Sequence, residues 1–339
     1  MSGCGGDATK PVMDLRLNLA QSSSSEFVGN PHTVTATLTN GAIAQPGIAI
    51  LFTVTGASAQ GPTSRNTDAT GIATLQYTGT AAGVDVITVS VPSQPGLMST
   101  PAALNCTWKN GSVHFLFDHA VDGQVLGFDD LRYRNAAGND YSVTNLFYYV
   151  SNIALHGAGG SVISDSTVHY RDGRVASTRD WLLDDVPSGS YASVSFTFGL
   201  DERWNRAGAL PTTQESLNMQ WSPLLGGGYH YMKLEGFFST GGGARMGYFT
   251  HTGRIQDPGD PVAHPHFFTV TLPLGPLSVH QDSWDVQIVM NLNGWYATPN
   301  LLNFDIFGPS IMDNLGLQQQ LQENGPHAFS IGTVSHAGP

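Results

Sequence analysis

Apolar and polar residues alternate along most of the chain, in short runs separated by turn residues. In the first third these runs lie at 33–39, 49–54, 71–77 and 85–91. A period of two is typical of half-buried β-strands, because successive side chains point to opposite faces. Short strands at this spacing predict a β-sandwich over residues 11–108. The serine run 22–25 looks like linker.

A second series of strand-like runs begins at Val113 and continues to the end of the chain. Its clearest members lie at 141–155, 191–198, 229–237, 267–272 and 284–291. The break between the two series predicts a short connection near Trp108–Gly111 and a second, larger domain over residues 112–339. Helix is favoured chiefly at 308–324, where Ile311, Leu315 and Leu321 recur near helical spacing. The predicted fold class is therefore all-β with little helix.

Composition agrees with turn-rich β structure and excludes some classes of protein. Charged residues make up 12% of the 339 residues, about half of the usual share, while Gly 40 and Pro 19 are high. The formal net charge is −12 and no basic patch is present, so we expect no nucleic-acid partner. No apolar run approaches the roughly 18 to 20 residues that a membrane-spanning helix needs.

The placement of the two cysteines is more informative than their number. The opening residues MSGCGG resemble the end of a bacterial lipoprotein signal, in which small residues precede the cysteine that becomes acylated. This resemblance implies that Cys4 carries lipid and that residues 1–10 form a tether. The protein would then lie in the bacterial cell envelope, at the periplasm or cell surface, anchored to the outer membrane. The alternative is a flexible end with a Cys4–Cys106 disulfide.

Familiar catalytic signatures are missing from the sequence. It contains no HExxH, GxSxG, P-loop, GxGxxG or EF-hand motif. The doublets Asp129-Asp130 and Asp184-Asp185 would point to opposite faces of a strand, which separates their carboxylates. We therefore expect a protein that is not an enzyme, with a hydrolase of unrecognised type as an alternative.

Histidine stands out in a chain that is poor in charge, and most of the twelve histidines follow residue 113. An extended backbone would place His264 and His266 on one face. His230 lies two positions before Met232, so an extended strand would place both on one face, among apolar neighbours. His251 ends a strand before a turn. Neutral imidazole suits copper and zinc. The alternative is that these histidines are dispersed over turns and core.

Two parts of the chain resemble known families. Asn30-Pro31, Gln45-Pro46-Gly47 and the string TDATGIA at 67–73 resemble bacterial immunoglobulin-like domains of the invasin and intimin type. That resemblance implies an immunoglobulin-like β-sandwich that acts as a spacer or adhesive stalk.

Seven strings in the second domain, taken in order, resemble the MbnP-like family. They are YRNAAG at 133–138, LFYYVSNIAL at 146–155, DVPSGSY at 185–191, FGLD at 198–201, MQW at 219–221, GYHYMKLEG at 228–236 and HTG at 251–253. The resemblance implies a copper-associated cell-envelope protein. In characterised relatives a dihaem enzyme of the MbnH type oxidises a tryptophan to kynurenine, and copper-binding relatives use that kynurenine together with histidines.

The family commonly shows a Met-x-Trp-x-Trp string, and here Met219, Trp221 and Pro223 occupy the matching places. The resemblance thus makes Trp221 the candidate for modification, with a simple core role as the alternative. Many members also carry four cysteines, which this domain lacks. The predicted metal site draws on His230, His251, His264 and His266, with Trp221 or its product nearby. The rival function is surface adhesion or a structural role without metal.

Overall fold

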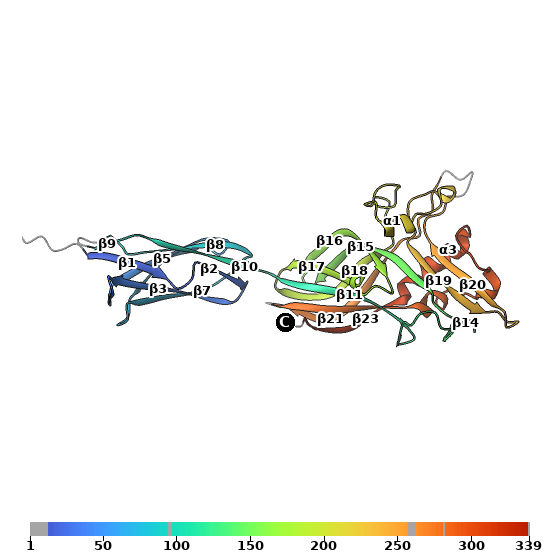
Figure 1. Cartoon of the computed structure of the whole chain (residues 1–339), viewed down its shortest axis with the longest axis horizontal. Helices are drawn as coiled ribbons and strands as arrows, with labels where there is room; N and C mark the ends of the chain where they lie inside the picture. Colours follow the sequence, from blue (N-terminus) through green and yellow to red (C-terminus); the bar gives the residue numbers. More distant parts are fainter. Residues whose placement is uncertain (1–12, 94–96, 257–261, 281, 338–339) are drawn as a thin grey trace, which may run out of the picture. The chain divides into compact units, whose positions relative to one another are not determined.

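The computed structural model describes residues 13–93, 97–256, 262–280 and 282–337, and both parts of the chain are built mainly of strands (Figure 1). The chain divides into two compact units. Unit 1 extends to Gly111 and takes in His280–Asp282, and unit 2 holds Ser112–Val279 and the residues from Ser283 on. The all-β fold class is confirmed. Independent folding of the two parts stays a prediction, and the segment 1–10 with Cys4 lies outside the described residues.

Unit 1 is an immunoglobulin-like sandwich of two five-stranded sheets. One sheet holds β4 (Ile43–Ala44), β3 (Pro31–Asn40), β1 (Met13–Leu19) and β9 (Leu97–Ser99), with β7 (Ile72–Thr78) also paired to β3. The other holds β2 (Ser23–Phe27), β10 (Ala102–Lys109), β8 (Gly83–Ser90), β5 (Ala49–Gly56) and β6 (Gln60–Asn66). The alternation predicted from the sequence is present, since Val34, Ala36 and Leu38 of β3 all face the core.

The serine run that looks like linker belongs to a strand. Ser23–Phe27 pairs in parallel with β10, from Ser23 opposite Asn105 to Phe27 opposite Lys109. This strand ends the sheet order and its side chains are largely solvent-accessible. Edge strands of this kind tolerate polar sequence, which is why the hydrophobic pattern did not reveal it.

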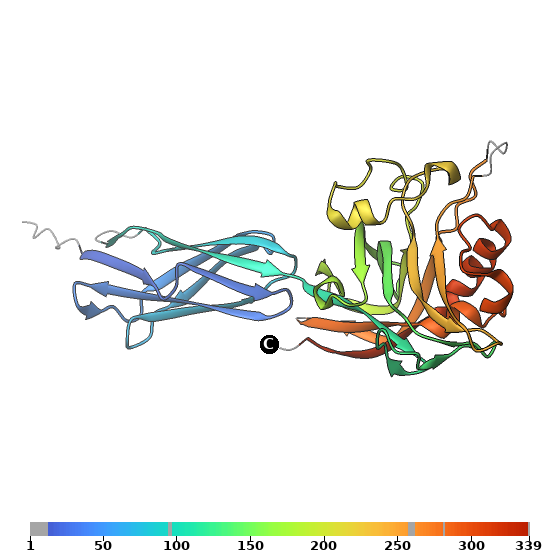
Figure 2. The same ribbon diagram turned by 45° about the vertical axis from the view of Figure 1, so that its right-hand side comes forward.

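Unit 2 packs a five-stranded sheet against an eight-stranded sheet (Figure 2). The smaller sheet holds β12 (Gln124–Val125), β11 (Gly111–Val121), β22 (Ser283–Asn291) and β23 (Phe329–His336), with β17 (Asp180–Val186) paired to β11. The larger holds β13 (Tyr133–Arg134), β14 (Asp140–Tyr141), β19 (Met232–Ser239), β15 (Asn145–Gly157), β18 (Gly189–Phe198) and β21 (Phe268–Val279), with β16 (Val162–Asp172) on β15 and β20 (Arg245–Thr252) on β19. One contiguous apolar core includes Phe117, Tyr148 and Ile288.

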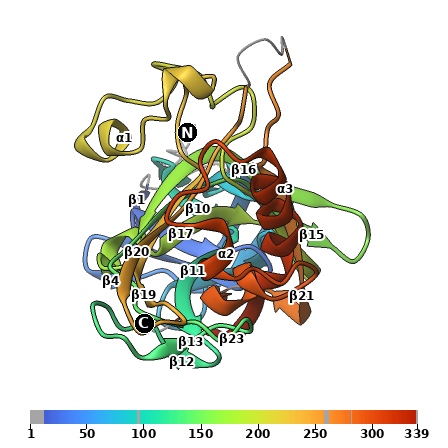
Figure 3. The same ribbon diagram turned by 90° about the vertical axis from the view of Figure 1, so that its right-hand side faces the viewer.

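Helices in unit 2 are short. They are α1 (Gln214–Asn218), α2 (Phe304–Phe307) and α3 (Leu315–Asn324), with 3-10 turns η1 (Ala176–Thr178), η2 (Pro223–Leu225), η3 (Leu292–Tyr296) and η4 (Gly325–Ala328); Figure 3 shows α1 and α3 from one end of the unit. The helix predicted at 308–324 begins only at Leu315, because the side chain of Asn314 caps it by accepting from the backbone N–H of Leu317. No helix in the described ranges is long and apolar enough to span a bilayer.

A buried carboxylate joins the two sheets of unit 1. Asp85 is 0% exposed and accepts hydrogen bonds from Trp108 Nε1 at 2.7 Å, from the Ser58 backbone N–H at 2.7 Å and from the Tyr77 hydroxyl at 3.3 Å. A buried polar group is costly unless it is hydrogen-bonded, and these three donors satisfy the Asp85 carboxyl group. Cys106, opposite Asp85 in the β8–β10 pairing, is buried and forms no disulfide with any described residue.

Replacing Asp85 with Ala is predicted to destabilise unit 1 by about 3 kcal/mol, because three buried donors lose their acceptor. Asp14→Ala is the matched control, since Asp14 is an exposed strand residue of the same unit; it should change stability by less than about 0.5 kcal/mol. Hydrogen exchange of β8 and β10, measured by mass spectrometry, reports on this unit separately. Unchanged protection in Asp85→Ala would contradict the role given to the carboxylate.

Candidate metal centre

Trp221, His230 and His251 lie side by side in unit 2, although they come from different elements. Trp221 follows α1, His230 precedes β19 and His251 lies within β20. The ring centroids of Trp221 and His230 are 4.7 Å apart, and those of His230 and His251 are 5.0 Å apart. All three side chains are buried. The structure thus brings together three of the five residues that the sequence predicts for the site.

His230 is fixed by the loop that precedes it. Its Nδ1 donates to the carbonyl oxygen of Met219 at 3.1 Å, and its backbone N–H donates to the same oxygen at 2.7 Å. Asn205 holds the residues on either side, because its side chain accepts from the backbone of Tyr229 at 2.8 Å and donates to the hydroxyl of Tyr231 at 3.0 Å. These contacts define the position of the His230 ring without using its Nε2.

The strand predicted around His230 is shorter than expected. The strand predicted at 229–237 begins only at Met232, and the preceding residues form an isolated bridge between Tyr229 and Gln220. The strand alternation therefore does not extend to His230, whose ring packs against both Trp221 and His251. The backbone of this loop is held by its pairing with Gln220, so the two-residue alternation of a strand does not determine where the His230 side chain points.

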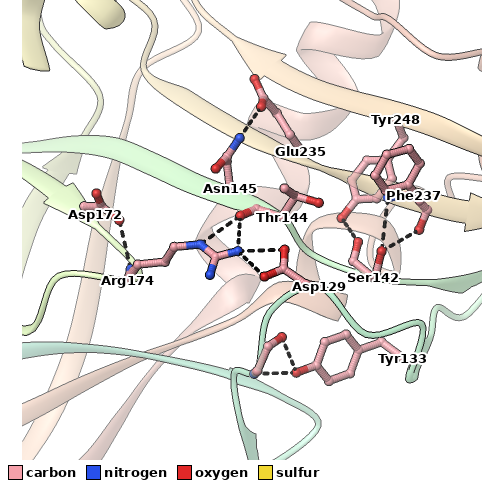
Figure 4. A network of polar contacts seen from close by, with 11 residues as sticks. Asp129, Tyr133, Ser142, Thr144, Asn145, Asp172, Arg174, Glu235, Phe237 and Tyr248 are labelled. Carbon is pink, nitrogen blue, oxygen red and sulfur yellow. Dashed lines mark hydrogen bonds and ion pairs between the residues drawn. The ribbon is translucent and has the colours of Figure 1, made fainter.

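His251 is fixed by a carboxylate on the neighbouring strand. Pairing of β19 with β20 places Lys233 opposite His251, and Glu235 Oε1 lies 2.8 Å from His251 Nε2. The other oxygen of Glu235 accepts from Asn145 Nδ2 at 2.7 Å (Figure 4). From the far side, Gln318 of α3 donates to the His251 carbonyl at 2.6 Å and accepts from the Gly253 N–H at 3.2 Å. His251 thus lies in a rigid frame of two strands and a helix.

One nitrogen of each imidazole is left available. His230 Nε2 and His251 Nδ1 are buried, and neither has a hydrogen-bond partner in the part of the chain that the structure describes. The opposite nitrogens donate to Met219 and Glu235, and a neutral imidazole carries one proton only. In the neutral form of each ring the available nitrogen carries a lone pair, which is the form that a metal requires.

Burial favours the neutral, metal-competent form of His230. Removal from water, together with the neighbouring His251, lowers the pKa of His230 to about 3. Burial by itself would raise the pKa of Glu235, but hydrogen bonds from His251 and Asn145 and the charges of His251 and Lys233 bring it down to about 2. A neutral imidazole and an ionised carboxylate therefore coexist over the ordinary pH range.

Trp221 packs flat against the backbone of Gly253. A Cβ added at Gly253 would lie 2.8 Å from the indole ring, so only glycine leaves room for this contact. The indole Nε1 donates to the Leu225 carbonyl at 3.3 Å. The HTG string at 251–253 thus supplies both a histidine and the surface on which the tryptophan lies.

His264 and His266 are placed differently from the pair. His266 is buried and its Nδ1 lies 3.0 Å from the carbonyl oxygen of Gly253. The backbone of His264 pairs with Ile255, and its side chain is partly exposed. Among the described residues, no three His, Cys, Asp or Glu side chains gather around a common point. A ligand role for His264 and His266 stays a prediction.

Three residues that hold the site were missed by sequence reasoning: Asn145, Glu235 and Gln318. The signal that could have found Glu235 is the glycine-rich segment 241–243 between the two strands, which predicts a β-hairpin. Pairing across that hairpin brings Glu235 into reach of His251. Asn145 and Gln318 are far away in sequence, so no local pattern marks them.

The two carboxylates of the doublet Asp129-Asp130 are engaged by different arginines. Asp129 accepts twice from Arg174 Nη2, at 2.7 and 2.8 Å, as Figure 4 shows. Asp130 instead pairs with Arg132. Each carboxylate is therefore engaged by its own guanidinium on the surface.

Fold and site together define a two-unit β protein whose larger sandwich buries two histidines beside a tryptophan. A family model described as MbnP matches residues 110–313, and the chain therefore belongs to the MbnP family. Membership of this family supports a copper-related role, and the family in general is linked with MbnH-type partner enzymes.

Solved structures with a similar arrangement include MbnP from Methylosinus trichosporium, at 14% identity over 67% of this chain and 99% of that chain, with a TM-score of 0.40. They also include invasin, a bacterial integrin-binding protein, at 15% identity over 54% of this chain and 45% of that chain, with a TM-score of 0.26. A C-terminal fragment of intimin in complex with the intimin-binding domain of its translocated receptor matches at 13% identity over 53% of this chain and 57% of that chain, with a TM-score of 0.24. No curated protein matches the chain.

Gly253→Ala is predicted to displace Trp221, because the added methyl group meets the indole ring. The expected loss is about 1 to 3 kcal/mol of unfolding free energy. Gly247→Ala in β20 is the control, since its Cβ would meet only ordinary contacts from 3.4 Å outwards. Thermal unfolding and near-ultraviolet circular dichroism measure both effects. Equal behaviour of the two variants would show that the Gly253 contact is not tight.

Acid should destabilise the metal-free protein through His230. Its folded pKa of about 3 lies below the value of about 6.5 in the unfolded chain. The unfolded state therefore binds more protons between these values, and stability falls as the pH drops below about 6.5. The slope from this residue is roughly 1.4 kcal/mol per pH unit. Denaturant unfolding should show a shallower pH dependence in His230→Asn than in wild type, and identical slopes would disprove this assignment.

Proposed function

We propose that unit 2 binds copper at the site formed by His230 and His251, with Trp221 or its oxidation product as a third contributor. The observation that carries the proposal is a pair of buried nitrogens, His230 Nε2 and His251 Nδ1, that have no hydrogen-bond partner among the described residues and belong to rings whose centroids are 5.0 Å apart. Leaving two such nitrogens without partners is costly unless a ligand occupies the space between them.

Copper fits this donor set better than other common metals. Imidazole suits copper and zinc, and the general order of affinity places Cu²⁺ above Zn²⁺ at nitrogen ligands. Both histidines have their second nitrogen bonded to a protein acceptor, which is the usual arrangement around a metal-bound histidine. Because two histidines leave coordination positions open, a further ligand is required.

Trp221 is the candidate for that further ligand, after modification. The indole nitrogen only donates, so tryptophan itself offers no lone pair. Conversion to kynurenine would cleave the C2–C3 bond of the indole with uptake of oxygen from an oxidant activated by a haem enzyme, and hydrolysis would release C2 as formate. The former ring nitrogen would then be an aromatic amine, which has a lone pair. We propose that a dihaem enzyme of the MbnH type is the partner that supplies the oxidising equivalents, so that the chain is a substrate of that enzyme and not an enzyme itself.

The proposal also includes a cellular location for the protein. Lipid on Cys4 would hold it in the bacterial cell envelope, at the outer membrane, and unit 1 would act as a spacer. A surface adhesion or structural role without metal is the rival account. It gives no reason for the unpartnered nitrogens of His230 and His251.

Copper titration of the purified metal-free protein tests the proposal. We expect one tight Cu²⁺ site for each chain that zinc does not displace at equal concentration. His230→Ala and His251→Ala should each weaken copper binding by more than about tenfold, or about 1.4 kcal/mol. His114→Ala is the control and should leave the copper affinity unchanged. His114 is 41% exposed and pairs with Asp285 across β11 and β22 of the smaller sheet.

Equal copper affinity of wild type and both histidine variants would refute the site. Mass spectrometry of the protein isolated with and without its native haem enzyme tests the modification. The tryptophan-to-kynurenine mass change is expected on the peptide that contains Trp221, and only when the enzyme is present. The same change confined to other tryptophans would refute the assignment to Trp221.

A further inference from the structure

We propose that Glu235, oriented by Asn145, determines which nitrogen of His251 is available to the metal. This inference rests on the proposed copper site, but it concerns a residue that does not itself touch the metal position. Glu235 is a positioning residue: its carboxylate fixes the tautomer of His251, and the tautomer fixes the ligating atom as Nδ1.

The first step is the contact between Glu235 and His251. Glu235 Oε1 lies 2.8 Å from His251 Nε2, and an ionised carboxylate can only accept hydrogen bonds. Nε2 must therefore carry the imidazole proton. In the neutral ring the lone pair is then on Nδ1, which is buried and has no partner among the described residues.

The second step is the contact between Glu235 and Asn145. These residues lie opposite each other in the pairing of β15 with β19, and Asn145 Nδ2 donates to Glu235 Oε2 at 2.7 Å. A donor thus faces one side of residue 235 and the imidazole faces the other. With the Asn145 amide in its observed orientation, residue 235 meets its NH₂ and must present an acceptor.

A Gln side chain at position 235 would reverse the arrangement. An amide has one accepting oxygen and one donating NH₂. With Asn145 in its observed orientation, its NH₂ would draw the amide oxygen of residue 235 towards itself, so the NH₂ of residue 235 would face His251 Nε2. That nitrogen would then have to accept, the proton would move to Nδ1, and the ligating position would be blocked. Glu235→Gln is nearly isosteric, so the change is chemical rather than steric.

Replacing Asn145 with Asp in the same chain should undo the effect. The carboxylate would then stand at 145 and accept from the amide NH₂ at 235, which turns the amide oxygen back towards His251 Nε2. Nδ1 would again carry the lone pair. The double variant also keeps the net charge of the wild type, which separates tautomer control from a simple charge effect.

The decisive experiment compares the wild type, Glu235→Gln and the double variant Glu235→Gln/Asn145→Asp in the full chain. Nitrogen-15 NMR of the metal-free proteins should show His251 protonated at Nε2 in the first and third and at Nδ1 in the second. Titration with CuCl₂ should show about 10 to 100-fold weaker binding in Glu235→Gln. The double variant should recover most of that affinity.

Glu202→Gln is the matched control. Glu202 is 56% exposed and lies 3.5 Å from Arg254, so this variant removes one carboxylate charge without touching His251. Copper affinity and the His251 tautomer should stay as in the wild type. If Glu235→Gln does not fold, Glu235→Ala replaces it and should populate both tautomers, because it removes the acceptor without adding a donor.

Retention of the Nε2 proton in Glu235→Gln would overturn the proposal, as would equal weakening of copper binding by Glu202→Gln. A double variant that regains the tautomer but not the affinity would also overturn it. Absence of copper binding in the wild type would instead refute the proposed function. The NMR comparison, made without metal, would still decide whether Glu235 sets the tautomer.

Discussion

Two imidazole rings can be buried against each other only if each gives its proton to a suitable acceptor. In unit 2 the Met219 carbonyl serves His230 and the Glu235 carboxylate serves His251. Burial then holds His230 neutral, since it lowers the pKa to about 3. With Nδ1 of His230 and Nε2 of His251 engaged by these acceptors, the other nitrogen of each neutral ring carries the lone pair. The chemistry attributed to the site depends on this distribution of two protons.

The surrounding fold holds these acceptors in place. The β19–β20 hairpin brings Glu235 to His251, and Asn145 on β15 fixes the carboxylate from the other side. The preceding loop is held by Asn205, whose side chain contacts the residues on either side of His230. Gln318 ties α3 to the backbone that carries His251 and Gly253. Residues from distant parts of the sequence thus enclose a single pair of rings.

The sequence pattern predicts the strands well, because a half-buried strand must alternate apolar and polar residues. The pattern gives the wrong result where backbone pairing forms without an alternation of apolar and polar residues. His230 lies outside the strand that its neighbours predict, and the polar edge strand Ser23–Phe27 has no apolar face to reveal it. The contact between Glu235 and His251 depends on the register of β19 against β20. The contact between Asn145 and Glu235 depends on the register of β15 against β19. Register between strands is a tertiary property, so composition and local spacing contain little information about it.

The central claim is that His230 Nε2 and His251 Nδ1 face one metal position. A crystal structure of the copper-loaded protein, with anomalous scattering recorded at the copper edge, tests it most directly. The account predicts one anomalous peak about 2.0 Å from both nitrogens, near the usual metal–imidazole distance, with Glu235 still bonded to His251 Nε2. A peak at other histidines alone, or copper bound through His251 Nε2 with Glu235 displaced, would contradict it.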